Sequence, residues 1–247
     1  MSRKVYRITG SDRTEFLQGL VTNNVTKLKD GLVYTAMLTP QGKYIADFFL
    51  APAEEAILLD VDAELGPGLM QRLTMYKLRS DVQIEETALH VHRDVTSRPQ
   101  GAFADPRSDK LGWRAYRETP QEDEDTTDWE ALRVANGIPA PGRELTPDSF
   151  ILEMGFERLN GVDFKKGCFV GQEVVARMKH KTELRKGLAR VTADAPLSAG
   201  DEITSGGKPA GKVLTTAHNA ALAYLRFDRA EKGIEAGGQK LEFERLV

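Results

Sequence analysis

The segment from Lys186 to Val247 most constrains the fold, because it consists of short strand-like runs separated by glycine turns. Five runs follow one another: GLARVTA, DEITS, KPAGKVLTTA, NAALAYLRF and QKLEFERL. Short alternating runs with turn residues between them are typical of antiparallel barrels and sandwiches. We therefore expect residues 186–247 to form a small antiparallel barrel or sandwich.

The first 95 residues instead alternate strand patterns with helix patterns. The strand-like KVYRITG precedes a helical pattern around Phe16, where Asp12 and Glu15 have the spacing of a capping box. Two further strands meet at the turn Thr39-Pro40-Gln41-Gly42, in which proline and glycine suit the second and fourth positions. The strand EEAILLDVD, the helix GPGLMQRLTMYKL and the strands DVQIEE and ALHVHRD follow. This order predicts a two-layer α+β domain.

Residues 96–127 differ in composition from their surroundings. They are rich in proline and glycine, and we expect a surface excursion around a short strand at GWRAYR. The acidic run QEDEDTTD predicts a solvated loop, and Thr127 with Glu130 predicts a capping box for the helix DWEALRVANG. We expect residues 1–95 to form an N-terminal α+β part, which residues 125–180 complete. The other expected parts are the surface excursion at 96–127, an α+β segment at 128–185 and the barrel at 186–247.

Composition excludes several classes of protein. No apolar run reaches the roughly 20 residues of a membrane helix, and the net charge of -3 argues against a nucleic-acid binder. The single cysteine cannot form an intramolecular disulfide or supply all ligands of a zinc site or iron-sulfur cluster. The four histidines form no recognised metal motif, so we expect no tightly bound metal. The basic start MSRKVYRITG lacks an apolar signal core, which predicts a cytoplasmic location.

The cysteine lies in KKGCFVGQEVVAR, residues 165–177, between Gly167 and Gly171. A helical pattern begins just after Cys168, and Lys166 lies two residues before it. A thiol near a helix N-terminus and beside cations is stabilised as a reactive thiolate, and we expect Lys166 to contribute to this. A buried, inert cysteine at a tight turn explains the same pattern.

The same segment resembles the signature of the YgfZ folate-binding family, in which K-G-C-aromatic-x-G-Q-E precedes an apolar pair and Ala-Arg. The matching residues are Lys166, Gly167, Cys168, Phe169, Gly171, Gln172, Glu173, Ala176 and Arg177. The stretches FLQGLVTNNV, LTPQGKYIADF, YKLRSDV and LRVANGIP resemble other parts of the family. The stretch ILEMGFERLNGVDFKKGCFVGQE looks nearer to the family's mitochondrial members than to a T-protein. Together these stretches extend the resemblance over nearly the whole chain.

This resemblance implies a fold like that of the glycine cleavage T-protein, a ring of α+β domains around a folate channel plus a C-terminal antiparallel β-barrel. It implies tetrahydrofolate as cofactor and a role in assembly or repair of iron-sulfur clusters, with client or scaffold proteins as partners. Cys168 would then ligate a cluster transiently with a partner's ligands, or undergo redox chemistry with folate.

The resemblance also suggests site residues, each of which has a simpler explanation. Asp47 falls where T-proteins carry an acidic pair and can orient or deprotonate an amine, but a strand-end aspartate at the surface fits equally. Glu173 and Gln172 contact a ligand or merely cap a helix, and Arg177 contacts a ligand or pairs with Glu173. The residues that can line the folate channel are Gln18, Thr22, Asn23 and Arg79. A helix end rich in polar residues also forms without any ligand, which is the simpler explanation.

Two other functions stay open. A folate-dependent aminomethyltransferase has an arginine, an apolar residue and a pterin-binding glutamate where this chain has Arg133, Val134 and Ala135, so the carboxylate is missing. A non-catalytic folate-binding adaptor would bind folate without turnover.

Overall fold

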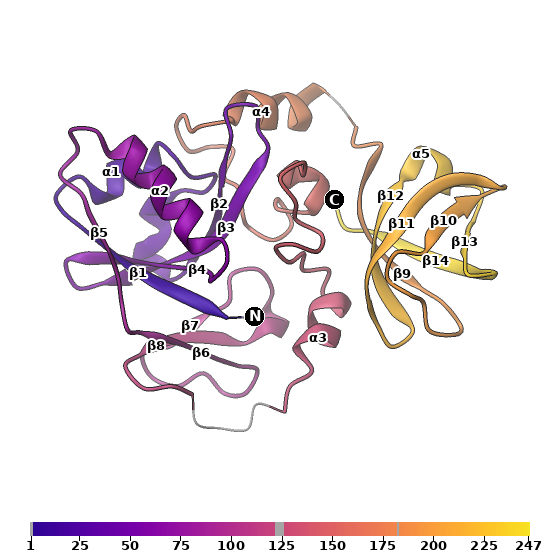
Figure 1. Ribbon diagram of the computed structural model, residues 1–247, viewed down its shortest axis with the longest axis horizontal. Helices are drawn as coiled ribbons and strands as arrows, with labels where there is room; N and C mark the ends of the chain where they lie inside the picture. The colour runs from indigo at the N-terminus through magenta and orange to yellow at the C-terminus, as the bar shows by residue number, and fades with distance from the viewer. Residues whose placement is uncertain (1, 122–125, 182) are drawn as a thin grey trace. The chain divides into compact units, whose positions relative to one another are not determined.

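The computed structural model describes residues 2–121, 126–181 and 183–247, and the chain divides into two compact units (Figure 1). Unit 1 contains Met1–Thr127 and Leu159–Gln172, and unit 2 contains Asp128–Arg158 and Glu173–Val247. The chain therefore enters each unit twice, and the unit boundary falls inside the stretch 165–177. The sequence predicted that the barrel begins a separate part at residue 186. In the structure, the barrel belongs to the same unit as residues 128–158 and 173–185.

Unit 1 is built on a five-stranded antiparallel sheet of order β2-β3-β4-β1-β5. Its hairpin between β2 and β3 places Ala36 opposite Asp47. The turn predicted at Thr39–Gly42 is confirmed: Gly42 donates its N–H to the oxygen of Thr39 at 2.8 Å and has a φ of 75°. The strands are β1 (Arg3–Thr9), β2 (Val33–Leu38), β3 (Tyr44–Ala53), β4 (Ala56–Asp62) and β5 (Gln83–Glu86).

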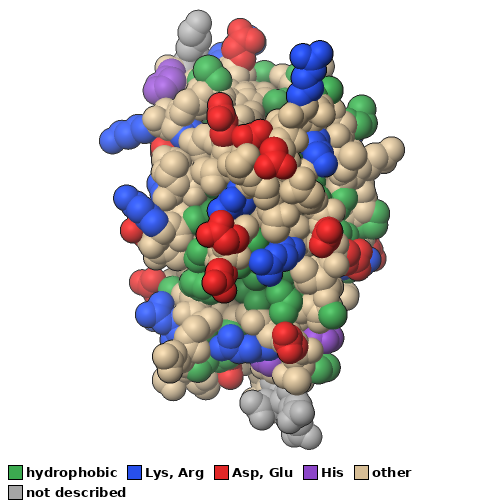
Figure 2. Space-filling model, turned by 90° about the vertical axis from the view of Figure 1, so that its left-hand side faces the viewer, with side chains coloured by type: hydrophobic (Ala, Val, Ile, Leu, Met, Phe, Trp, Pro, Cys, Tyr) green, Lys and Arg blue, Asp and Glu red, His purple; other side chains and the backbone are tan. Residues whose placement is uncertain are grey.

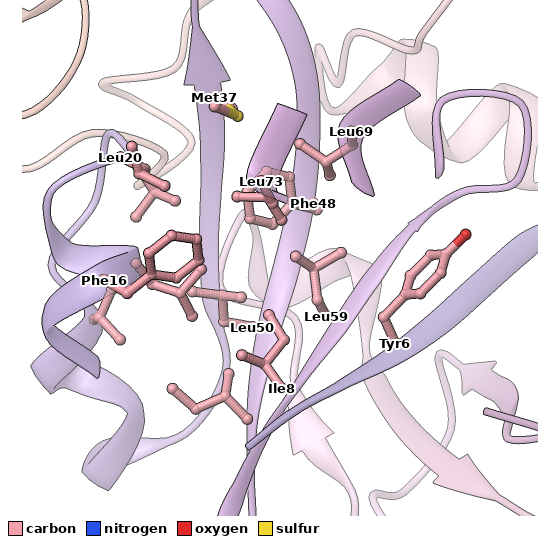
Figure 3. Packing of buried hydrophobic residues seen from close by; sticks show 14 of the residues in the cluster. Tyr6, Ile8, Phe16, Leu20, Met37, Phe48, Leu50, Leu59, Leu69 and Leu73 are labelled. Carbon is pink, nitrogen blue, oxygen red and sulfur yellow. The ribbon is translucent and has the colours of Figure 1, made fainter. Parts of the chain in front are cut away.

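One face of this sheet packs against the short helices α1 (Arg13–Gln18), η1 (Val25–Asp30) and α2 (Gly66–Lys77). Because side chains alternate along a strand, every second residue of β3 and β4 enters this core. Leu69 and Leu73, four residues apart on α2, are buried in it. Figure 3 shows these helix residues gathered with Phe16, Leu20, Met37, Phe48, Leu50 and Leu59.

The capping box predicted at the start of α1 is wrong. Asp12 occupies the N-cap position, but its side chain forms no capping bond. Its carboxylate instead accepts a hydrogen bond of 2.8 Å from the N–H of Asp81, which lies beyond α2. The start of α1 is thus held by a long-range contact.

A three-stranded sheet of order β6-β8-β7 also belongs to unit 1. Its elements are β6 (His90–Asp94), β7 (Phe103–Ala104), η2 (Asp109–Leu111) and β8 (Trp113–Arg117). Buried Arg114 lies 3.3 Å from a carboxylate oxygen of Asp60 and 3.3 Å from one of Asp105. Burial alone raises the pKa of Asp105, but Arg107 and Arg114 outweigh it and hold that pKa at about 2.

Residues 96–121 are therefore more than the expected surface excursion, because they carry part of a buried ionic network. Buried charges are stable only when paired, and Arg114 provides that pairing for two carboxylates. The strand predicted at GWRAYR is confirmed as β8. Residues 122–125 of the predicted acidic loop lie outside the described residues.

Unit 2 contains a closed antiparallel barrel of order β10-β11-β12-β9-β14-β13, as expected for this part of the chain. Its strands are β9 (Lys186–Thr192), β10 (Glu202–Ser205), β11 (Lys208–Ala217), β12 (Ala220–Arg226), β13 (Ile234–Ala236) and β14 (Gln239–Arg245). The other elements are α3 (Trp129–Ala135), η3 (Ile151–Met154), α4 (Gln172–Lys181) and α5 (Phe227–Ala230). None of the described helices is long and apolar enough to cross a membrane.

The capping box predicted from Thr127 and Glu130 is also wrong, because the N-cap lies one residue later and Ala131, not Glu130, occupies the third helical position. Asp128, and not Thr127, is the N-cap of α3, and its carboxylate accepts a 2.9 Å hydrogen bond from the N–H of Ala131. Aspartate is a strong N-cap residue, so the shift follows ordinary capping preferences.

Candidate functional site at the Cys168 loop

Cys168 is exposed on the loop between Leu159 and Gln172, here called the Cys168 loop. Gly167 beside it is also exposed, whereas Lys166 and Phe169 are only 6% and 8% exposed. The thiol thus lies at the surface between two buried anchor residues. The alternative of a buried cysteine is therefore wrong.

Lys166 fixes the centre of the loop to α1. Its Nζ donates hydrogen bonds to the main-chain oxygens of Gln18, at 2.6 Å, and Val21, and lies 5.1 Å from the ring centre of Phe169. The last carbonyls of a helix have no partner within it, so the ammonium satisfies acceptors that would otherwise be unpaired. Burial lowers the pKa of Lys166 to about 8, although Asp163 opposes the shift. These hydrogen bonds tie Lys166 to α1 rather than to the thiol.

Gly171 fixes the end of the loop to the β2–β3 turn. It has a φ of 85°, and a Cβ atom at this position would lie 2.6 Å from the oxygen of Thr39. A side chain would therefore meet both a steric clash and an unfavourable backbone conformation. Glycine is required here because the loop packs directly on the turn.

The start of the loop is fixed to the segment that follows α1. Thr22 accepts a hydrogen bond from the N–H of Asp163 at its main-chain oxygen, and its hydroxyl donates to the oxygen of Gly161 at 2.7 Å. The amide of Asn23 donates to the oxygen of Asn160 at 2.6 Å, and Lys27 lies 2.8 Å from the carboxylate of Asp163. Residues that are distant in sequence thus hold both ends of the Cys168 loop.

These hydrogen bonds give a structural role to three of the residues expected to line a folate channel. Thr22 and Asn23 are buried, and their polar groups hold the loop or the sheet. The side-chain amide of Gln18 donates to Asn24, while its oxygen accepts from the N–H of Val25. Thr22 and Asn23 thus hold the Cys168 loop through their side chains, and Gln18 holds it through its main-chain oxygen.

Asp47 is 4% exposed, so it is not the surface aspartate that one explanation required. Its two oxygens accept hydrogen bonds from the phenols of Tyr44, at 2.6 Å, and Tyr34, at 2.9 Å. Burial, followed by the charge of Asp47, raises the pKa of both tyrosines. Arg107 lies over the ring of Tyr34, 5.3 Å from its centre. Asp47 is therefore bound at both oxygens inside unit 1.

Sequence patterns missed Tyr34 and Tyr44 as partners of Asp47, and Arg107 as a neighbour of the Tyr34 ring. Tyr44 is close in sequence, but Tyr34 reaches Asp47 only through the register of the β2–β3 hairpin. Arg107 belongs to the segment expected as a surface excursion. No local pattern joins these three residues.

The remaining candidates are Arg79, Gln172, Glu173 and Arg177. Arg79 is exposed after α2 and lines a hollow of about 860 Å³ with Phe16, Tyr76 and Leu78. Glu173 and Arg177 are exposed on α4, and no ion pair joins them in the part of the chain that the structure describes. Gln172, half-buried, donates its N–H to the oxygen of Phe169 at 3.1 Å.

No group of three or more potential metal-binding side chains occurs among the described residues. The exposed thiol therefore has no local set of further ligands within that part of the chain. Any metal centre bound at Cys168 must draw on other donors.

Comparison with known proteins identifies the family. Residues 185–246 match the model of the CAF17 C-terminal beta-barrel domain. The iron-sulfur cluster assembly factor IBA57 of Homo sapiens, mitochondrial, is 30% identical over 271 residues, which cover 90% of this chain and 75% of that protein. The chain belongs to the IBA57 family of iron-sulfur cluster assembly factors. The mouse (Mus musculus) IBA57 is 29% identical and a Mycosarcoma maydis homologue 27%, covering 91% and 93% of this chain and 75% and 73% of those proteins.

A solved structure supports the fold of this IBA57-family chain. The glycine cleavage system aminomethyltransferase T from Bartonella henselae superposes with a TM-score of 0.78 at 14% identity, covering 97% of this chain and 81% of that one. The expected T-protein-like α+β fold with a closed C-terminal barrel is confirmed. The narrower assignment to folate-binding YgfZ proteins goes beyond what the IBA57 relatives show.

The IBA57 relatives also correct the expected location. All those named here are described as mitochondrial, which contradicts the cytoplasmic location predicted from the sequence.

Proposed function

We propose that this chain assists iron-sulfur cluster assembly by lending the thiolate of Cys168 as one ligand of a cluster whose other ligands come from a partner protein. The observation that carries this proposal is an exposed thiol on a loop held at both ends and at its centre. Clusters are held by several protein ligands, commonly four cysteines, and the chain has one cysteine. A cluster bound at Cys168 must therefore share its ligands with a partner protein. The cluster is cargo that passes between proteins and not a resident cofactor of this chain.

The loop suits this role because its main chain is fixed while its thiol remains accessible. Ligation requires the thiolate, so the proton leaves Sγ as the iron-sulfur bond forms. A fixed loop presents the sulfur at a constant position and lowers the entropic cost of completing a shared ligand set. Exposure leaves space for the partner's ligands.

Tetrahydrofolate binding is a separate part of the proposal, supported by the fold shared with aminomethyltransferase T. Of the side chains expected to bind it, Thr22 and Asn23 use their polar groups in hydrogen bonds inside unit 1. Asp47, expected to orient or deprotonate an amine, accepts hydrogen bonds at both oxygens. We therefore assign no step to folate. Calorimetric titration of tetrahydrofolate into wild type and Cys168→Ala tests it: equal, saturable binding supports a site independent of the thiol, and no binding removes folate from the account.

Aminomethyl transfer has less support. Arg133 pairs with Glu130 at 2.9 Å and Glu144 at 2.7 Å, and Ala135 supplies no carboxylate at the place where a T-protein is expected to bind the pterin. These contacts assign Arg133 to the structure of unit 2.

The proposed function is tested by reconstitution with ferrous iron, sulfide and glutathione, which supplies the missing thiol ligands. We expect visible absorption from a protein-bound cluster in wild type and at least a tenfold loss in Cys168→Ser, with unchanged circular dichroism. A matched control carries Thr74→Cys together with Cys168→Ser, which moves the thiol to an exposed position on α2. Cluster retention by Cys168→Ser, or equal binding by the relocated thiol, would contradict the proposal.

A further inference from the structure

Asp163, five residues before Cys168, holds the loop with both oxygens of its carboxylate. Oδ1 accepts a hydrogen bond of 2.8 Å from the N–H of Lys165, and Oδ2 lies 2.8 Å from Nζ of Lys27 on η1. An aspartate that accepts the N–H two residues further on forms an Asx-turn, in which the side chain mimics a backbone turn. This turn begins the segment that carries Lys166 and Cys168.

The main chain around the thiol is not held by hydrogen bonds of its own. None of the N–H groups of residues 167–171 donates to an acceptor in the described part of the chain. Gly167 adds to this freedom, because glycine restricts the backbone little and a Cβ atom there would meet nothing within 4 Å. The place of the sulfur is therefore set by the flanking contacts, those of Asp163 and Lys166 before it and of Gly171 after it.

The ion pair of Asp163 differs from an ordinary surface pair. Figure 2 shows acidic and basic side chains interspersed over one face of the molecule, and exposed pairs of that kind add little to stability. The Asp163 side chain is instead only 14% exposed. Burial alone raises its pKa, but hydrogen bonds from Lys27 and from the N–H groups of Lys165 and Lys166 outweigh burial and lower that pKa. The folded loop thus favours the charged carboxylate.

The same part of the chain binds both the main chain and the side chain of Asp163. Its N–H donates to the oxygen of Thr22 at 3.0 Å, while its carboxylate pairs with Lys27. Nζ of Lys27 also lies 3.3 Å from the side-chain oxygen of Asn23, which is buried. Residues 22–27 therefore fix the point from which the turn starts.

We infer that Asp163 is the positioning residue of the Cys168 thiol, an inference that rests on the proposed function. Its carboxylate holds the turn in one conformation, and the turn sets where the sulfur meets a cluster bound by other ligands. Without the bond to Lys165, residues 167–171 sample several conformations, and the apparent affinity for the cluster falls with the fraction that presents the sulfur correctly. The role requires an acceptor at the place of Oδ1 rather than a negative charge.

Two conservative variants separate the place of the acceptor from the charge. Asp163→Asn keeps an oxygen that can accept from Lys165, whereas Asp163→Glu keeps the charge and moves it one methylene away. Each is titrated with a preformed iron-sulfur cluster ligated by glutathione and followed by visible circular dichroism. We expect Asp163→Asn to raise the Kd by less than about threefold, and Asp163→Glu and Asp163→Ala to raise it by about tenfold.

The matched control is Lys4→Met, which breaks an ion pair of the same length, 2.8 Å, between Lys4 and Glu86. We expect it to leave the Kd unchanged. Wild-type affinity in Asp163→Glu would overturn the inference, because a displaced carboxylate would then suffice. A loss in Asp163→Asn equal to that in Asp163→Glu would overturn it too, because an acceptor in the right place would not have restored binding. These two variants decide the inference even where Asp163→Ala does not fold.

Resonance Raman spectra give a readout that a role in stability alone would not change. The chain has one cysteine, so β-deuterated cysteine marks the iron-sulfur stretching band of Cys168. We expect this band to be broader in Asp163→Glu, because the sulfur takes several positions, and to have the wild-type width in Asp163→Asn and Lys4→Met. A band of wild-type width in Asp163→Glu would contradict the positioning role.

The two proposals fail separately. If Cys168→Ser loses the cluster while Asp163→Glu binds it with the wild-type Kd and band width, the positioning role is wrong and the proposed function stands. If Cys168→Ser retains the cluster, the proposed function itself is wrong.

Discussion

The ammonium of Lys166 lies 2.6 Å from the main-chain oxygen of Gln18, a hydrogen bond between residues 148 positions apart. This bond joins the Cys168 loop to α1. Replacing Lys166 with methionine leaves the oxygens of Gln18 and Val21 without their donor in a buried site. We expect Lys166→Met to lower the free energy of unfolding by about 2 kcal/mol, measured by urea titration, and to speed amide hydrogen exchange in residues 161–171. Exchange unchanged in that segment would show that the loop is held by its ends alone.

Stability should depend on pH through the same residue. The folded pKa of Lys166 is lowered by burial to about 8, from a usual 10.5. Between these values the unfolded state binds the proton that the folded state has released, so stability rises with pH in this window. Below about 8 both states hold the proton, and the hydrogen bonds of Lys166 contribute at a constant level. Urea titrations at about pH 7.5 and 9.5 should show wild type gaining on Lys166→Met at the higher pH. A gap that stays constant would contradict the lowered pKa.

Two glycines of the loop form a matched pair for mutation. A Cβ atom at Gly171 would meet the oxygen of Thr39 at 2.6 Å, whereas one at Gly167 would meet nothing within 4 Å. We expect Gly171→Ala to cost roughly 1–3 kcal/mol and Gly167→Ala to change stability by no more than about 0.5 kcal/mol. Thermal melts followed by circular dichroism measure both. Equal effects would mean that contact with the β2–β3 turn does not require glycine.

The buried position of Asp47 predicts a structural effect. Asn at this position can accept from one phenol but presents an amide to the other, so Asp47→Asn should lower the free energy of unfolding by about 1–3 kcal/mol. Glutathione-supported cluster binding at Cys168 should be unchanged. A fully stable Asp47→Asn protein that had lost cluster or tetrahydrofolate binding would instead assign Asp47 a direct role in that binding.

The sequence predicts those parts of the fold that local patterns determine. Five of the six barrel strands, the turn at Thr39–Gly42 and strand β8 follow from alternation and from turn residues, which act over a few positions. The three-residue strand β13 was not predicted. The candidate loop was also identifiable, because glycines bracket the single cysteine. The accessibility of the thiol was not predictable, since it depends on where Lys166 and Phe169 are buried.

Long-range contacts account for what the sequence did not show. Asp12 lost its predicted capping role because the N–H of Asp81 reaches its carboxylate from beyond α2. Thr22 and Asn23 were expected to bind a ligand because no local pattern shows their hydrogen-bond partners, which belong to residues 160–163. The boundary of the units within the stretch 165–177 likewise has no counterpart in local composition.

The most direct test of the account is resonance Raman spectroscopy of the glutathione-supported cluster on protein that contains β-deuterated cysteine. The chain has one cysteine, so any shift of an iron-sulfur(cysteine) stretching band on labelling arises from Cys168 alone. The account predicts such a shift, together with bands from unlabelled glutathione that do not move. A spectrum identical with and without the label would show that Cys168 does not ligate the cluster and would contradict the central claim.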